Sequence, residues 1–376
     1  MGKLRVPNFA SDAGKQRIMN KRVWMVLSAS LLLLSGAGLY TYQRYHARGP
    51  SVRGDVLAMM PSDASAVVFV DLAELRAAPF VAQLYAWAPQ PQPDEDYAQF
   101  LTETGFHYER DLDHLAMAFE KNGQDSTFFA VAEGRFDRQR ISALAIKSGS
   151  VEKRGGREIF AVPEDHGASK IYFTFLSNER IALTDRADLA QTLSAKKRPL
   201  DHAEWRTRFE RLAGSPVFAV IRQDAAPGEA LLSQAPGGFR SRQLSTMLDQ
   251  LQWITLAGKP DSDRLRVVAE GECSSEETAR KLADLLNGVL TLAGAGLDNA
   301  KTRRQLDPAL REAYLALLKG ADISKIDRGD TKSVRLAFEI TSAFLESARR
   351  SSTGLPEAAP AKPAPGNTTK AKKGHT

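Results

Sequence analysis

Two histidines and three acidic residues lie within eight positions of the chain, from His107 to His114. Imidazole and carboxylate groups act as general acids and bases in hydrolases, and they also bind metal ions. The spacing of this cluster matches no zinc-binding pattern, so we expect neither a metal ion nor another cofactor. If the protein is an envelope hydrolase or another enzyme, then His107, Asp111 and His114 are the candidate residues.

A second group of residues combines positive charge with a large aromatic ring. Lys196, Lys197 and Arg198 are consecutive, and Trp205 follows in the same segment. Lysine and arginine attract anionic groups, and a tryptophan ring can stack on a sugar or a cation. These residues are a candidate ligand face for an anionic polymer or another partner in the cell envelope. The alternative is a solvated basic linker with Trp205 packed in the core.

The chain contains none of the motifs that identify common enzyme classes. It has no G-x-S-x-G turn, Walker loop, dinucleotide fingerprint or H-E-x-x-H motif. The tripeptide Arg328-Gly329-Asp330 resembles an adhesion motif, but turns favour these residue types for backbone reasons. The single cysteine, Cys273, excludes an intrachain disulfide. The residues therefore favour binding or scaffolding over catalysis.

An uncharged apolar run from Val23 to Tyr42 dominates the N-terminal region. A helix of about 20 residues rises about 30 Å, the thickness of the hydrocarbon core of a bilayer. Lys and Arg are more numerous before the run than after it, which favours an N-terminus inside and the rest of the chain outside. We predict a basic leader over 1–22, a single-pass transmembrane helix over 23–43 and a linker over 44–55.

This segment places the protein in the cytoplasmic membrane, with the lipid bilayer as a partner through residues 23–43 and the folded part in the periplasm or outside the cell. The alternative is a cleaved signal peptide, because Ser35-Gly36-Ala37 resembles a small-residue cleavage site.

Positive charge is concentrated at the two ends of the chain. Residues 1–54 carry nine Lys/Arg and one acidic residue, and residues 351–376 carry four lysines and one glutamate. The remaining residues hold 38 of the 51 basic side chains and 43 of the 45 acidic ones. A mildly acidic folded part argues against nucleic acid as a partner. Residues 351–376 are rich in Ala, Pro, Lys and Thr and are predicted to form a disordered tail.

The region between the ends contains one sequence pattern twice. Val131-Ala132-Glu133-Gly134 matches Val268-Ala269-Glu270-Gly271. Each match belongs to a predicted β-hairpin, and the first hairpin turns at Asn122-Gly123, where both residues accept positive φ. A continuous apolar strand precedes each hairpin, at 65–70 and at 215–221. Such runs suit central strands that are covered on both faces.

Signals for the start of a helix follow each match. Ser274 and Glu277 form a capping box before an apolar helical face. Asp137 is the predicted N-cap of the corresponding helix in the first half, and Asp185 is that of a later helix. Further hairpins are expected over 158–176 and 323–340, and further helices over 308–319 and 342–350.

This order of elements predicts an α+β fold. We expect two similar halves of antiparallel sheet with helices packed on one face, preceded by one transmembrane helix. Half 1 covers 56–198 and half 2 covers 199–350.

The segment from Pro61 to Leu72 and the hairpin from Arg154 to Phe160 are similar to segments of uncharacterised bacterial envelope proteins. The resemblance implies a single-pass protein with a duplicated α+β extracytoplasmic domain and brings no catalytic residues. An apolar-ligand carrier is another alternative, because the helix from Leu282 to Leu297 is strongly apolar. An internal pocket under that helix would favour the carrier. A cleft that joins the 107–114 side chains would favour the enzyme, and solid cores in both halves would favour the scaffold.

Overall fold

The computed structural model describes residues 51–87, 95–122, 125–164, 169–223 and 242–353. The predicted leader, the predicted transmembrane helix and residues 354–376 of the predicted tail lie outside these ranges. Residues 51–55 of the predicted linker and 351–353 of the predicted tail are helical instead. Within the described ranges, no helix combines the length and hydropathy that a membrane crossing requires.

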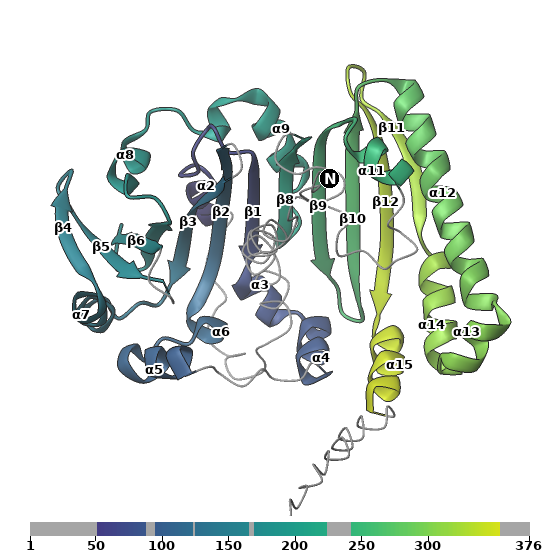
Figure 1. The fold of residues 1–376 in the computed structure, drawn as a ribbon, viewed down its shortest axis with the longest axis horizontal. Coiled ribbons are helices and arrows are strands. Elements are labelled where there is room, and N and C mark those ends of the chain that lie inside the picture. Colours follow the sequence, from purple (N-terminus) through teal and green to yellow (C-terminus); the bar gives the residue numbers. More distant parts are fainter. Residues whose placement is uncertain (1–50, 88–94, 123–124, 165–168, 224–241, 354–376) are drawn as a thin grey trace, which may run out of the picture.

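Twelve strands form one continuous antiparallel sheet in this part of the chain (Figure 1). Their order is β11-β12-β10-β9-β8-β1-β2-β3-β7-β6-β5-β4. The prediction of a mixed α+β fold with antiparallel sheet is thereby confirmed. The strands are β1 (Ala66–Asp71), β2 (Leu112–Asn122), β3 (Asp125–Gly134), β4 (Ser150–Arg154), β5 (Arg157–Pro163), β6 (Lys170–Phe175), β7 (Arg180–Thr184), β8 (Val217–Arg222), β9 (Leu251–Pro260), β10 (Arg264–Cys273), β11 (Asp322–Asp327) and β12 (Lys332–Thr341).

Helices lie at both ends of the strands and beside the sheet, with α12, α13 and α14 gathered near β11 (Figure 1). The α-helices are α2 (Ser51–Leu57), α3 (Leu72–Ala77), α4 (Pro79–Trp87), α5 (Glu95–Thr104), α6 (Tyr108–Asp111), α7 (Arg138–Ser148), α8 (Leu189–Ser194), α9 (Ala203–Arg211), α11 (Arg242–Leu248), α12 (Glu276–Asp298), α13 (Ala300–Gln305), α14 (Pro308–Lys319) and α15 (Ser342–Thr353).

Helices cover both faces at the centre of the sheet, so the prediction of helices on one face is wrong there. Alternate residues of a strand point to opposite faces. Val67 and Phe69 of β1 pack in a core with residues of α2, α8 and α9, whereas Val68 and Val70 pack with residues of α3 and α4. All residues from Ala66 to Val70 are buried, because a continuous apolar run needs cover on both sides.

Residues that face each other across adjacent strands form a symmetric row in the middle of the sheet. Read from β7 to β12, the row is Ala182, Val131, Ala116, Phe69, Phe218, Ala257, Val268 and Ala337. The order Ala-Val-Ala-Phe is thus repeated in reverse on the other side of the β1–β8 pair. The two Val-Ala-Glu-Gly segments lie in β3 and β10, each between its hairpin partner and a strand from later in the chain.

Two predicted helix starts lie elsewhere in the structure. The sequence prediction missed strand β7, and Asp185 accepts a hydrogen bond from the backbone N–H of Phe128 (3.0 Å) instead of capping a helix. The following helix, α8, has Asp188 at its N-cap position. The N-cap of α12 is Ser275 rather than Ser274, because β10 continues as far as Cys273. The predicted N-cap Asp137 is confirmed and accepts from the N–H of Arg140.

Candidate functional site

His107 lies at the N-cap position of α6, a single helical turn, and Asp111 is the last residue of that turn. The backbone N–H of His107 donates to Oδ2 of Asp111 (2.9 Å), and the guanidinium groups of Arg110 (2.9 Å) and Arg135 (3.2 Å) form ion pairs with the same carboxylate. Burial by itself raises the pKa of Asp111, but these contacts outweigh it and hold the pKa below its usual value. Asp111 is therefore an ionised residue that ties α6 to the chain after β3.

His114 lies on β2 with its ring between two carboxylates. Asp71 on β1 and Glu133 on β3 are its neighbours across the sheet. Nε2 of His114 lies 3.5 Å from Oδ2 of Asp71, and Nδ1 lies 3.6 Å from Oε2 of Glu133. On β7, Nη2 of Arg180 lies 3.6 Å from the same oxygen of Glu133. We call these four side chains, from four adjacent strands, the His114 row.

The surroundings of His114 favour its charged form. Burial by itself lowers the pKa of the imidazole, but Asp71 and Glu133 outweigh this effect and raise the pKa to about 9. Burial likewise raises the pKa of Asp71, yet the contacts with His114 and with the backbone N–H of Glu74 keep it below its usual value. A protonated imidazole cannot accept a proton, so His114 is not available as a general base at neutral pH.

The described contacts do not join His107, Asp111 and His114 into one cluster. The carboxylate of Asp111 is engaged by two arginines, and the ring of His114 is engaged by carboxylates from the neighbouring strands. Among the residues that the structure describes, no group of three or more His, Cys, Asp and Glu side chains is arranged to hold a metal ion.

The residues of the second candidate group also separate. Lys196 and Lys197 are exposed. Arg198 turns back to donate to the carbonyl oxygens of Thr192 (3.2 Å) and Leu193 (2.9 Å) at the end of α8. Trp205 is 1% exposed, and its ring packs edge-on against that of Trp253. Core packing, the alternative given above, is what the structure shows for Trp205, so its ring offers no stacking surface to a ligand.

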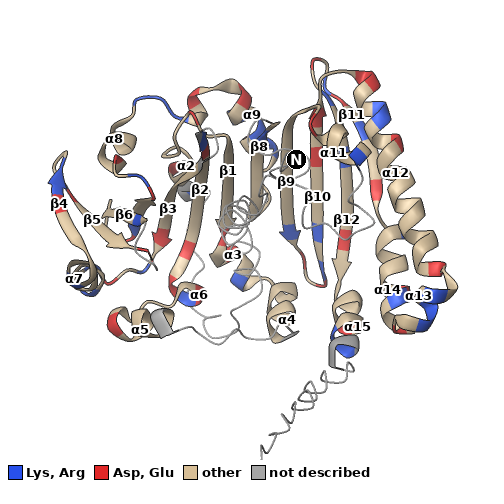
Figure 2. Cartoon of the chain, in the orientation of Figure 1, with Lys and Arg blue, Asp and Glu red and all other residues tan. Residues whose placement is uncertain are grey.

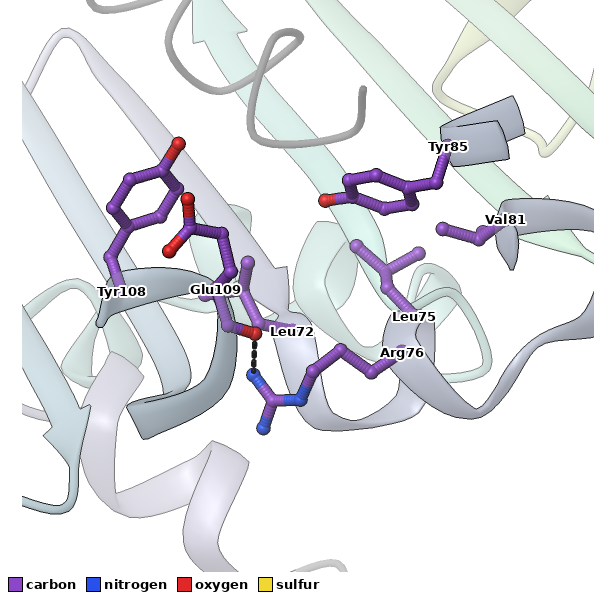
Figure 3. A pocket seen from close by; sticks show the side chains of 7 residues that line it. All are labelled: Leu72, Leu75, Arg76, Val81, Tyr85, Tyr108 and Glu109. Carbon is purple, nitrogen blue, oxygen red and sulfur yellow. Dashed lines mark hydrogen bonds between the residues drawn. The ribbon is translucent and has the colours of Figure 1, made fainter. Parts of the chain in front are cut away.

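Two of the hollows in the described part of the chain bear on these candidates, and Tyr108 and Glu109 of the 107–114 segment line the first of them. The first, shown in Figure 3, has a volume of about 10 Å³ and is lined by residues of α3, α4 and α6. Arg76 donates to the carbonyl oxygen of Glu109 across it (3.3 Å), and the space is about that of one water molecule. The second, of about 580 Å³, lies open to the surface between α11 and α12 and is lined by Arg242, Gln243, Thr246, Met247, Lys281 and Leu285.

Sequence reasoning missed Asp71, Glu133 and Arg180 as partners of His114. Glu133 carried a signal, since it belongs to the repeated Val-Ala-Glu-Gly segment. Asp71 and Arg180 carried none, because only the pairing of β1 with β2 and of β3 with β7 brings them into the row.

No protein-family model matches the chain, and no curated protein matches it. Crystal form III of TP0453 is similar over 79% of this chain and 98% of that chain, with 12% identity and a TM-score of 0.43. Crystal form I of TP0453 is similar over 79% and 97%, with 11% identity and a TM-score of 0.43. Similarity this weak carries no argument about function.

Proposed function

We propose that the chain is a membrane-anchored, extracytoplasmic binding or scaffolding protein of the bacterial envelope, and that it works without catalysis. The uncharged run from Val23 to Tyr42 and the basic residues before it support the anchor and its orientation. The observation that supports the non-catalytic part is that the candidate residues do not converge, since Asp111 is paired with two arginines and His114 with Asp71 and Glu133.

Two buried apolar clusters support a scaffold, one that spans the β1–β8 pair and one nearer to β12. One unites β1, β2, β3 and β8 with α2, α8 and α9, and another packs α11 and α12 against β9, β10 and β12. Such cores hold surface residues in fixed relative positions. Leu282 and Ala283 of the apolar helix belong to the second cluster, which supports a packing role for this part of α12 over a carrier pocket.

We also infer that the folded part arose by duplication and resembles the duplicated envelope domains named above. The symmetric row of eight residues supports this inference, because a chance match of four residues does not require matching neighbours in space. A second correspondence is an ion pair. Glu133 contacts Arg180 on the next strand (3.6 Å), and Glu270 contacts Arg335 on the next strand (3.4 Å).

Protease treatment of intact spheroplasts tests the location. We expect residues 55–350 to be digested and the anchor to remain with the membrane. Protection until lysis would refute the orientation, and a mature N-terminus at Gly38 would refute the anchor.

Crosslinking in whole cells tests the binding function. The full chain should enrich specific envelope components relative to a control that carries the same 1–55 segment on an unrelated domain. An identical set of crosslinked components from both proteins would refute the proposal.

A further inference from the structure

Four arginines and two glutamates meet around the carboxylates of β10, and we call this group the arginine cluster. Arg208 and Arg211 come from α9, Glu270 and Glu272 from β10, Arg328 from the turn after β11, and Arg335 from β12. Figure 2 shows acidic positions on strands within the sheet as well as on helices. Glu270 and Glu272 are both buried.

The carboxylate of Glu270 accepts from three of these arginines, and that of Glu272 accepts from two. Both terminal nitrogens of Arg328 donate to the carboxylate of Glu270, and one of them lies 2.9 Å from Oε2. Arg211 (3.1 Å) and Arg335 (3.4 Å) contact the same carboxylate. Glu272 accepts hydrogen bonds from Arg211 (2.5 Å) and from Arg208. A carboxylate offers about four acceptor positions. The four hydrogen bonds to Glu270 occupy all of them, so Glu270 can accept none from a further group.

Among the described residues, four guanidinium groups against two carboxylates leave this cluster with an excess of two positive charges. Its guanidinium groups are not fully hydrogen-bonded either: the Nε atoms of Arg208 and Arg335 are buried and have no acceptor in the part of the chain that the structure describes. Charge removed from water without a counter-charge costs free energy. An anion at the open side of the cluster would offset that cost.

The other half of the sheet provides an internal comparison. Around Glu133, which corresponds to Glu270 in the symmetric pairing, protonated His114 and Arg180 face Asp71 and Glu133. With protonated His114, the four side chains of that row carry two charges of each sign, and Nδ1 of His114 also lacks a hydrogen-bond partner among the described residues. The excess in the arginine cluster is therefore not a requirement of the shared strand arrangement.

The open side of the cluster is formed by three arginines that all contact Glu270. The exposed fractions of their side chains are 23% for Arg211, 28% for Arg328 and 41% for Arg335. Their common carboxylate partner holds the three guanidinium groups close together, and each of the three side chains is partly exposed to solvent. Guanidinium groups bind tetrahedral oxyanions through paired N–H donors.

We propose that the arginine cluster is a binding site for a phosphate group that carries two negative charges, either free phosphate or a phosphate monoester. Such groups carry about −1.5 to −2 at neutral pH, which matches the excess of the cluster. This inference goes beyond the function proposed above, because that function assigns no role to these residues. It holds or fails whatever the location of the domain.

Calorimetric titration of the full-length chain in neutral detergent, at constant ionic strength, tests the site. Inorganic phosphate and glycerol 3-phosphate are the two probes, and the stronger binder identifies the source of the phosphate group. Succinate also carries two negative charges but divides them between carboxylates, so tighter binding of succinate would overturn the assignment. Absence of measurable binding of either phosphate probe would also overturn it.

Arg335→Gln and Arg211→Gln should each weaken phosphate binding about tenfold or more, because each removes a charge-assisted hydrogen bond. Arg303→Gln, on exposed α13, removes the same charge away from the cluster and should leave binding unchanged. Arg180→Gln removes the corresponding arginine of the balanced row and should also leave binding unchanged. Equal losses in all four variants, or unchanged binding in both cluster variants, would refute the site. Two cluster variants keep the test decisive if one of them fails to fold.

Discussion

The rings of Phe69 and Phe218 stack across the β1–β8 pair, with centroids 5.3 Å apart and planes inclined by 25°. The two residues are directly opposite each other in the strand register, and each is at most 1% exposed. The guanidinium of Arg53 lies over both rings, 4.8 Å and 5.6 Å from their centroids. Because β1 and β8 are the first strands of the two halves, this contact joins the halves through their cores.

Replacing either ring should therefore destabilise the whole sheet. Phe69→Ala and Phe218→Ala should each lower the free energy of unfolding by about 3–5 kcal/mol. The double variant should lose less than the sum of the two, since the rings contact each other. Urea unfolding measures all three. Leu292→Ala, at a position 73% exposed, is the control and should change stability by about 0.5 kcal/mol or less. Additive losses would show that the rings are not coupled.

The His114 row predicts a loss of stability at alkaline pH. The pKa of His114 is raised to about 9 in the folded protein, against about 6.5 when unfolded. Its contribution is therefore complete below about pH 6.5 and is lost as pH rises through 9. The change should be no more than about 3 kcal/mol. The urea midpoint measured from pH 6 to pH 10 should fall in the parent and change less in His114→Gln. Parallel curves for the two proteins would contradict a raised pKa of His114 in the folded protein.

The single cysteine should be inert in the folded protein. Cys273 is buried at the end of β10, and burial raises the pKa of its thiol to about 11. Because the thiolate is the reactive form, a disulfide reagent at pH 8 should label the native protein slowly and the denatured protein rapidly. Rapid labelling without denaturant would show that the end of β10 opens readily.

Local signals account for much of the fold. The apolar runs that became β1 and β8 and the turn at Asn122-Gly123 between β2 and β3 predicted four central strands, because burial and turn chemistry act within a few residues. Strand β7 was missed, since it has five residues and gains its place only by pairing with β3 and β6. Strand β4 is exposed throughout and offers no buried pattern.

The candidate sites were less accessible to sequence reasoning for the same physical reason. Asp71 lies on β1 and Arg180 on β7, and pairing through two intervening strands brings them into one row. Spacing along the chain suggested His107 as a partner of His114 instead. The arginine cluster was hidden in the same way, because Arg211 of α9 and Arg335 of β12 share the carboxylate of Glu270 only in the folded sheet.

Only the second of the two adjacent serines before α12 caps the helix in the structure. Oγ of Ser275 accepts a hydrogen bond from the backbone N–H of Thr278 (3.1 Å), and Ser275 has the extended backbone that an N-cap requires. Ser275→Ala should thus lower the free energy of unfolding by about 1 kcal/mol. Ser274→Ala removes the same hydroxyl one residue earlier and should change it by about 0.5 kcal/mol or less.

Urea unfolding of both serine variants beside the parent measures this difference. Ser275→Asp should retain most of the stability, because a carboxylate also accepts from the first turn of a helix and interacts favourably with its dipole. If Ser274→Ala were the more damaging change, the capping box that the sequence suggests with Glu277 would be the true start of the helix. β10 would then end before Cys273, and the register between β10 and β12, where Cys273 faces Lys332, would need revision.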